Sequence, residues 1–537
     1  MSVIDAILVL SQYPKKYEIK SFIMWLVGFF SVCLTFQENN LCYQQLVGSR
    51  RLHHHCRYSK WQRSNKTCCK LKTTVVWDKE TGKPLCNAIV WLDTRTADLA
   101  AEAITKTASK SQNEFKKKTG LPIHPYFSAL KLKWLLNNVE EVREAHTRGT
   151  LLFGTVDTWL IWNLTGEHVT DVSNASRTLL LDLHKRKWST ELCTFFELPQ
   201  DILPEIRSSA EVYGYFRSGP LVGVPIAGCL GDQQAAMVGH NCLQRGDTKN
   251  TYGTGTFMLC NIGTKPTISK NGLLTTVGFQ FGPDSPVVYA LEGSGSIGGN
   301  VVRFLRDNFQ FIKNGKQQFN KYGIQDAKEM EEICRSVSNT EGVYFVPSFT
   351  GLYTPYWDPT ARGTILGLTQ VSSRAHVCLA ALRAVAYQSA EMIAAVEHDL
   401  DNEKIITTLK VDGGMTSNGL FNEIQAEIIG KTIKVYNITI PYSYYLSDTF
   451  YIILIHFVLG LNYVFQTPKI TEISGWGAAV AAGIGAQQIS LSEFSTKESP
   501  VSALAIVYYP KFAEEQRTAD LSRWKEAVKR ACGWVNN

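Results

Sequence analysis

The chain has 537 residues, of which 45% are hydrophobic and 19% charged, and its formal net charge is +7. This is the balance of a globular protein with two or more cores, and it excludes low-complexity and repeat-built classes. The net positive charge comes from residues 1–72, which hold eleven Lys/Arg and three acids, and the remaining chain is close to neutral. We therefore expect no nucleic-acid partner.

The cysteines are unevenly distributed. Five of the thirteen fall between Cys33 and Cys69, and the others lie singly in apolar contexts, which predicts reduced, buried thiols of an intracellular protein. The stretches "HHHC" (53–56) and "CC" (68–69) lack the C-x-x-C spacing of zinc sites, so we expect no metal there.

Two apolar runs could touch a membrane. The run at 21–36 follows three lysines, the order of charges in a signal peptide or anchor, and the run at 449–465 contains His456 and Asn462. Each is shorter than the ~20 residues that a spanning helix needs. We expect a cytoplasmic protein without membrane contact, although these runs leave such contact open.

Regular elements begin at residue 73. Residues 73–93 predict a β-hairpin, and residues 126–142 predict one amphipathic helix with Ser128 as its N-cap. Residues 150–166 predict a strand, a turn and a helix capped by Asp157.

The second half of the chain repeats an alternation of strands, glycine turns and helices. Residues 249–260, 287–307 and 405–430 each carry an apolar run into a glycine turn, and the last two continue into a helix. This pattern predicts an α/β protein. Two such halves, meeting near residue 245, predict two domains with a cleft between them, where small ligands usually bind.

The glycine turns that close these three strands suit a nucleotide when taken together. Residues 253–256 offer backbone N–H groups and hydroxyls to a phosphate chain, Gly413 and Gly414 let a flat ligand approach the backbone, and Asn418 offers an amide to a base or ribose. "GSGSIG" (293–298) matches G-x-G-x-x-G, but no acid follows about 20 residues later and no protein-kinase motifs accompany it. One turn alone would only connect a strand to a helix, whereas three together favour a nucleotide site.

"GCLGDQQAA" (228–236) places Asp232 at the start of a predicted helix. Phosphoryl transfer to an alcohol needs a carboxylate that accepts the hydroxyl proton, and a helix N-terminus stabilises its ionised form. Gln233 can hydrogen-bond a neighbouring hydroxyl. A helix cap is the alternative role of Asp232, and this stretch alone does not decide between the two.

The sequence resembles the FGGY carbohydrate kinases, and most closely their glycerol kinase branch. The resemblance spans roughly 73–438 and resumes at 468–483. It is carried by "TTVVWDKETGKPL", "VWLDTRT", "YFSALKLKWLLNN", "FGTVDTWLIWNLTG", "TDVSNASRT", "GCLGDQQAA", "KNTYGTGTF", "GLYTPYWDPTARGTILGLTQ", "LKVDGGMTSN" and "PKITEISGWGAAVAAG". One further sequence signature of the family is nearly matched around 363–383, where Arg383 replaces an expected acid or glutamine.

The resemblance implies an α/β fold of two actin-like, ribonuclease-H-like domains around a central cleft. They would be an N-terminal, substrate-side domain (73–245) and a C-terminal, nucleotide-side domain (246–537). A divergent segment (1–72) precedes them, and an insertion falls near 442–467. The implied reaction is the ATP-dependent phosphorylation of glycerol to glycerol 3-phosphate, with Mg²⁺, by a homo-oligomer.

The resemblance also assigns individual residues. Asp232 would be the general base and would hold Mg²⁺ through water. The glycerol shell would be Trp91, Tyr126, Asp232, Gln233 and Phe257, and the nucleotide contacts would be Gly253, Thr254, Gly299, Gly414 and Asn418.

The chain departs from the family before Thr73. Residues 1–72 contain no D-Q-G-T-x-S-x-R phosphate loop, and the family's N-Q-R-E is replaced by Cys-Lys-Leu-Lys at 69–72. The segment and the insertion are either genuine, membrane-facing additions or mis-joined translated sequence, and their abrupt composition favours the second. We expect the chain to phosphorylate glycerol poorly or not at all. The alternative is a catalytically impaired relative that acts as a binding or membrane-associated protein.

Overall fold

The computed structural model describes residues 73–535, except for three single positions (92, 220 and 296) and the ranges 313–323, 436–472 and 497–504. The divergent segment 1–72, the insertion near 442–467 and both apolar runs lie outside the described residues. The "HHHC" and "CC" stretches lie outside them too. No disulfide joins the eight cysteines of the described part, six of which are buried, as the sequence predicted.

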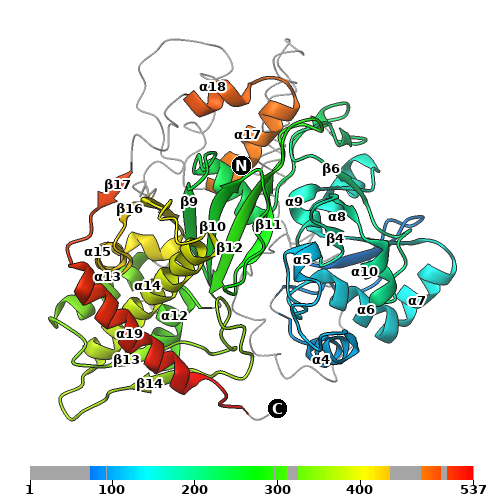
Figure 1. Cartoon of the computed structure of the whole chain (residues 1–537). Coiled ribbons are helices and arrows are strands. Elements are labelled where there is room, and N and C mark those ends of the chain that lie inside the picture. The colour runs from blue at the N-terminus through cyan, green and yellow to red at the C-terminus, as the bar shows by residue number, and fades with distance from the viewer. Residues whose placement is uncertain are drawn as a thin grey trace.

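A seven-stranded mixed sheet forms the centre of the larger lobe (Figure 1). Strand β15 is parallel to both of its neighbours, β9 and β16, and the other pairs in this sheet are antiparallel. In sheet order the strands are β11 (Leu274–Phe279), β12 (Val288–Gly295), β10 (Thr256–Gly263), β9 (Thr248–Tyr252), β15 (Thr408–Asp412), β16 (Thr432–Val435) and β17 (Ile506–Tyr508).

Helices cover both faces of this sheet, so β10 is buried on both sides. Met258 and Cys260 belong to the core that includes α14 (Arg374–Asp399) and α15 (Gly419–Ile429). Leu259, between them, belongs to the core of α11 (Asp232–Gly239) and α17 (Ile473–Gly485). This alternation is the two-residue period of a strand between two apolar layers.

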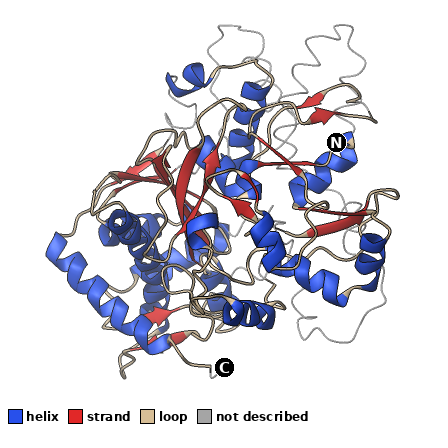
Figure 2. Ribbon diagram, turned by 45° about the vertical axis from the view of Figure 1, so that its right-hand side comes forward, coloured by secondary structure: helices blue, strands red, loops and turns tan. Residues whose placement is uncertain are grey.

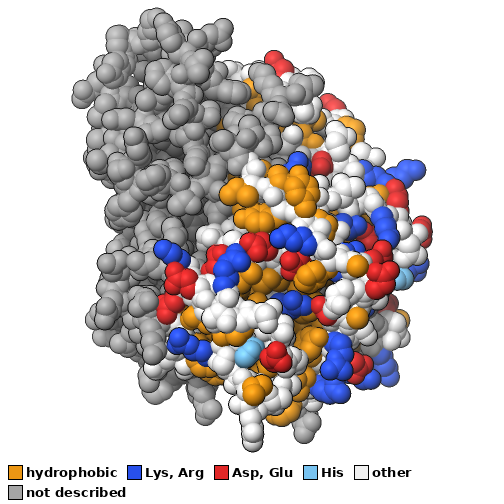
Figure 3. All heavy atoms as spheres, turned by 90° about the vertical axis from the view of Figure 1, so that its left-hand side faces the viewer, with side chains coloured by type: hydrophobic (Ala, Val, Ile, Leu, Met, Phe, Trp, Pro, Cys, Tyr) orange, Lys and Arg blue, Asp and Glu red, His pale blue; other side chains and the backbone are white. Residues whose placement is uncertain are grey.

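The remaining described elements of this lobe lie outside the central sheet. They are α12 (Asn300–Asp307), α13 (Ile324–Arg335), β13 (Tyr344–Val346), β14 (Thr364–Leu366), the 3-10 helix η2 (Gly414–Ser417), α18 (Leu491–Thr496) and α19 (Glu514–Ala531). On the face shown in Figure 3, acidic and basic side chains of the described residues are interspersed with apolar ones.

The smaller lobe consists of helices around short strand pairs (Figure 2). Its helices are α4 (Ala97–Lys106), α5 (Lys116–Thr119), α6 (Ser128–Asn138), α7 (Glu140–Thr147), α8 (Val156–Thr165), α9 (Val172–Ala175) and α10 (Thr190–Phe195). Its strand pairs are β1 (Val75–Asp78) with β2 (Leu151–Gly154), β3 (Val169–Asp171) with β6 (Glu205–Arg207), β4 (Leu181–Asp182) with β5 (Lys187–Trp188), and β7 (Gly214–Tyr215) with β8 (Pro225–Ile226).

The predicted hairpin at 73–93 is present only as two isolated bridges, Thr74 to Ile89 and Trp77 to Pro84. The ladder partner of β1 is the distant β2. All four residues of β1 are buried, so a strand from the same core satisfies its backbone better than the exposed turn residues that follow it.

The prediction of a single helix over 126–142 is wrong in one respect, because the segment forms two helices. It divides into α6 and α7 at Val139, whose extended backbone (φ −116°, ψ 117°) separates them. The N-cap of α6 is Phe127 rather than Ser128, and that of α8 is Thr155 rather than Asp157. Both polar residues lie one or two positions inside their helices, where boundaries are hardest to read from sequence.

The strand, turn and helix predictions for 287–307 and 405–430 are confirmed by β12 with α12 and by β15 with α15. Residues 249–260 instead form the β9–β10 hairpin around the turn 253–255. Helix α14 is long and apolar enough to cross a membrane, but 83% of its apolar window is buried inside the protein, so it is the central core helix of this lobe.

The helix that carries Asp232 packs against α17 with almost no separation. A Cβ atom added at Gly477 would lie 1.8 Å from the carbonyl oxygen of Ala235, and one added at Gly239 would lie 2.1 Å from that of Ile473. A Cβ added at Gly228, in the loop before α11, would lie 2.3 Å from the backbone nitrogen of Ala482. Glycines on both partners therefore bring the two backbones into contact, and α17 fixes α11 along its length.

We expect Gly477→Ala to destabilise the fold by about 1–3 kcal/mol, because the added methyl group meets backbone that cannot rotate away. Urea unfolding measures this loss. Gly419→Ala is the matched control, since its new methyl group would meet only the flexible Glu331 carboxylate, at 3.3 Å. Equal stability of the two variants would contradict the close packing of α11 and α17.

Candidate functional site

Asp232 is the first residue of α11, so its carboxylate lies at the positive end of the helix. The residue is half-buried. Its Oδ2 accepts a hydrogen bond from Gln233 Nε2 at 3.2 Å, whereas its Oδ1 is buried and has no hydrogen-bond partner among the described residues. An unpartnered carboxylate oxygen is suited to accept a proton or to face a cation.

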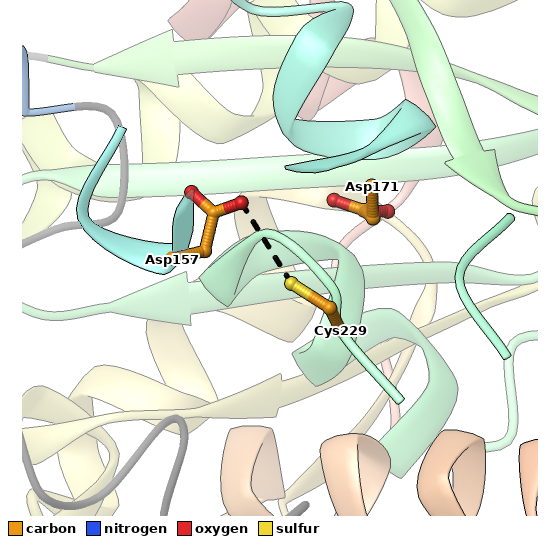
Figure 4. Close-up of side chains that lie close together, drawn as sticks. All are labelled: Asp157, Asp171 and Cys229. Carbon is orange, nitrogen blue, oxygen red and sulfur yellow. Dashed lines mark hydrogen bonds between the residues drawn. The ribbon is translucent and has the colours of Figure 1, made fainter. Parts of the chain in front are cut away.

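The loop before α11 is anchored by a buried polar group, Asp157, Asp171 and Cys229 (Figure 4). Cys229 Sγ donates to Asp157 Oδ2 at 3.8 Å, and Gly231 N donates to Ser173 Oγ at 2.9 Å. Asp171 caps α9 through the backbone N–H groups of Ser173 and Asn174. These contacts fix the position at which the chain enters α11.

The ligand atoms of Asp157, Asp171 and Cys229 all lie within 4.8 Å of one another, which would suit a metal ion. All four carboxylate oxygens, however, accept hydrogen bonds from the protein: Asp157 from Thr155, Thr170 and Cys229, and Asp171 from Ser173, Asn174 and Ser209. Burial raises the pKa of Asp157, and it raises that of Asp171 to about 6. The group is therefore a hydrogen-bonded anchor.

Three aromatic side chains of the predicted glycerol shell meet edge to face. The ring centroid of Trp91 lies 5.5 Å from that of Tyr126 and 5.6 Å from that of Phe257. Trp91 and Tyr126 come from the smaller lobe and Phe257 from β10, and all three are buried. The structure thus brings these residues together where the two lobes meet.

A buried ion pair crosses the same junction. Arg177, which follows α9, bonds Glu292 of β12 at 3.0 Å, and the side chains are only 1% and 0% exposed. The guanidinium carbon of Arg177 lies 5.9 Å from the ring centroid of Tyr126. The pair therefore ties the aromatic cluster to the central sheet.

The predicted nucleotide turns also converge. Gly299 N donates to Gly253 O at 2.7 Å, and Gly298 N donates to Thr254 O at 2.8 Å. Gly413 has φ +96°, and a Cβ atom there would lie 2.4 Å from Tyr252 O, so only glycine fits beside the hairpin. Gly253, Thr254 and Gly414 are exposed, and a Cβ atom added at Gly414 would have no described heavy atom within 4 Å beyond its chain neighbours.

Two of the predicted nucleotide groups already have partners inside the protein. Asn418 is 3% exposed and caps α15, since its Oδ1 accepts from Phe421 N at 2.9 Å. The Gly299 amide is used in bonding the neighbouring turn. These residues shape the turns, and the exposed surface available to a ligand comes from Gly253, Thr254 and Gly414.

Sequence reasoning missed a buried lysine that contacts Gln233 and an acid that interacts electrostatically with that lysine. Lys249 on β9 is fully buried, and its Nζ donates to Gln233 Oε1. Asp412 ends β15, with its Oδ1 3.4 Å from His240 Nε2. Burial alone would raise the pKa of Asp412, but His240 and Lys249 lower it. Alternation along β9 was the only available signal, and it does not distinguish a buried lysine from an exposed one.

Comparisons with known proteins agree with this architecture. The profile of the N-terminal domain of the FGGY family of carbohydrate kinases matches residues 68–239, and that of the C-terminal domain matches residues 248–439. A probable glycerol kinase of Caenorhabditis elegans is 69% identical over 464 residues, which cover 86% of this chain and 83% of that protein. A glycerol kinase of Nocardia farcinica is 41% identical over 468 residues, 86% of this chain and 83% of that protein.

Solved structures agree as well. The crystal structure of Plasmodium falciparum glycerol kinase with ADP matches with a TM-score of 0.72 and 34% identity, covering 87% of this chain and 83% of that one. A xylulose kinase from Brucella ovis shares the fold alone, at 22% identity with a TM-score of 0.62 over 86% of this chain and 81% of that one. The chain therefore belongs to the FGGY family of carbohydrate kinases, in its glycerol kinase branch, with the two-domain actin-like fold of that family.

Proposed function

We propose that this chain transfers the terminal phosphate of ATP to glycerol and releases glycerol 3-phosphate and ADP. The observation that carries the proposal is the buried Oδ1 of Asp232 at the start of α11, which has no hydrogen-bond partner among the described residues. Gln233 and Lys249 link Asp232 to Phe257, a member of the Trp91–Tyr126–Phe257 cluster. The kinship with glycerol kinases supports the choice of substrates.

In the proposed reaction the terminal hydroxyl of glycerol gives its proton to Asp232 Oδ1. The hydroxyl oxygen forms a bond to the γ-phosphorus as the bond from that phosphorus to the β–γ bridging oxygen breaks, and ADP leaves with the electron pair. Trp91 and Phe257 cover the CH groups of the polyol, and Tyr126 and Gln233 bond its other hydroxyls. The protein's contribution is mostly positioning and charge stabilisation.

The exposed turns at Gly253, Thr254 and Gly414 would receive the nucleotide, with Gly299 and Asn418 holding those turns in shape. Asp232 fits a role in holding Mg²⁺ through water, because its Oδ1 has no hydrogen-bond partner in the part of the chain that the structure describes. Mg²⁺, when bound with ATP, neutralises phosphate charge. We further propose that the substrate side comprises 73–245, the nucleotide side comprises 246–537, and the enzyme is a cytoplasmic homo-oligomer.

Turnover by the 537-residue chain is expected to be slow, because residues 1–72 contain no D-Q-G-T-x-S-x-R loop. Loss of a single oxyanion donor costs on the order of 100- to 1,000-fold in kcat, so loss of a whole phosphate-binding loop should cost at least about 100-fold. The base and the aromatic cluster are unaffected, since they lie beyond Thr73.

A chimera tests both statements. Residues 1–72 are replaced by a leading segment that bears D-Q-G-T-x-S-x-R and N-Q-R-E, and ADP release is measured with glycerol, other polyols and no acceptor. We expect glycerol-dependent turnover of about 1–100 per second from the chimera and a rate at least about 100-fold lower from the present chain. A chimera that prefers another polyol would contradict the proposed substrate, and equal rates would contradict the role of the missing loop.

A further inference from the structure

Lys249 is a buried charged residue that contacts the proposed site and to which no role has been assigned. It lies on β9 at 0% exposure. Its Nζ donates to three oxygens: Gln233 Oε1, Thr251 Oγ1 at 3.1 Å and the carbonyl oxygen of Phe257 at 3.3 Å. Two of these acceptors, Gln233 and Phe257, belong to residues of the proposed glycerol shell.

The charge of Lys249 is balanced by acids around it. Burial lowers the pKa of Lys249 to about 8, and the carboxylates of Asp412, Asp232 and Glu292 oppose that effect. The ammonium therefore remains the predominant form at neutral pH. Burying an ammonium group costs free energy even when acids surround it. Its presence here is therefore explained best by contacts that a neutral side chain could not make.

The contact with Gln233 fixes which way its amide points. An ammonium group has donors only, so it selects the oxygen of the amide and leaves Nε2 to face Asp232 Oδ2, at 3.2 Å. If the amide were reversed, its oxygen would face the carboxylate and its NH₂ group would face the ammonium, and both contacts would be repulsive. With Oδ2 held by Nε2, Oδ1 is the oxygen left to accept a proton.

We propose that Lys249 is a positioning residue for glycerol: it locks the Gln233 amide and the Phe257 backbone so that the polyol shell and the free oxygen of Asp232 keep one arrangement. This inference rests on the proposed function, because it names what holds the substrate side of that site. Lys249 itself need not touch glycerol.

A double-mutant cycle on glycerol affinity tests the proposal. Calorimetry measures the Kd of glycerol for the wild-type chain, Lys249→Met, Gln233→Leu and the double variant, so that the result does not depend on turnover. We expect each single substitution to weaken binding at least about 10-fold and the double variant to be within about 3-fold of the weaker single one, since both remove the same element. Additive losses, or an unchanged Kd in Lys249→Met, would overturn the proposal.

A second pair of variants reads the same contact in the folded protein without any ligand. Both variants are made in an Asp232→Asn background, because the second oxygen of a glutamate at position 233 would otherwise face and repel the Asp232 carboxylate. In that background Gln233→Glu puts one carboxylate oxygen against the ammonium and the other against an amide, so its melting temperature should stay within a few degrees of that of Asp232→Asn. The matched control is Gln234→Glu, because Gln234 is equally buried and its Oε1 has no hydrogen-bond partner among the described residues. The control should melt much lower, and equal destabilisation of both variants would show that Lys249 does not face Gln233. Wild-type protein that binds no glycerol would instead contradict the proposed function while leaving this comparison valid.

Discussion

Asp232→Asn should reduce glycerol phosphorylation about 100- to 10,000-fold, because the amide cannot accept the hydroxyl proton. Asparagine has nearly the shape of aspartate, so α11 and its packing on α17 should be unchanged. The substitution is best made in the chimera that carries the phosphate loop, where the initial rate is high. Coupled ADP release gives kcat, and calorimetry gives the Kd of glycerol, which should change only a few-fold.

Asp98→Asn is the matched control for this experiment. Asp98 is also an acid in the first turn of a helix, α4, but its side chain is exposed to solvent. Its substitution should leave kcat within about 2-fold of the parent value. If Asp232→Asn kept a tenth or more of the activity, the base would have to be another group.

Glu292→Gln should destabilise the protein by about 3–5 kcal/mol, because it leaves the Arg177 guanidinium buried without its charge partner. This is a large share of the 5–15 kcal/mol that folded proteins typically retain. Urea unfolding measures the loss. The double variant Arg177→Met/Glu292→Leu should recover most of it, since neither charge then remains buried.

An exposed ion pair provides the comparison. Arg245 and Glu403 lie 2.6 Å apart, but their side chains are 45% and 51% exposed. Glu403→Gln should cost less than about 1 kcal/mol, because water replaces the lost partner. If the two substitutions cost the same, the buried pair at the lobe junction would have no special role in stability.

Much of the candidate site could be predicted from short motifs. The glycine turns at 253–255 and 413–414 were predicted from strand endings, and Gly299 was assigned through family resemblance; the structure places all three turns side by side. Trp91, Tyr126 and Phe257 were assigned through family resemblance, and they meet at the lobe junction. Motifs of this kind record local backbone geometry, which is why sequence can predict them.

Residues whose role depends on distant partners could not be predicted. Lys249 belongs to a strand, and lysines are rarely fully buried, so composition argued against any role for it inside the site. The pairing of β1 with β2 joins segments far apart in the chain, and the local turn around Gly82 favoured the wrong partner. The break at Val139 likewise has no glycine or proline to announce it.

Helix α11 touches α17 backbone to backbone, yet the segment 436–472 separates α17 from β16 in the chain. The cost of closing a loop grows only with the logarithm of its length, by about 0.6 kcal/mol for each doubling. Additional residues between β16 and α17 therefore cost little conformational entropy. The position of α11 depends instead on the glycines that let its backbone contact that of α17. The length of the connection between β16 and α17 could therefore change, by evolution or by faulty splicing, as long as α17 still packed against α11.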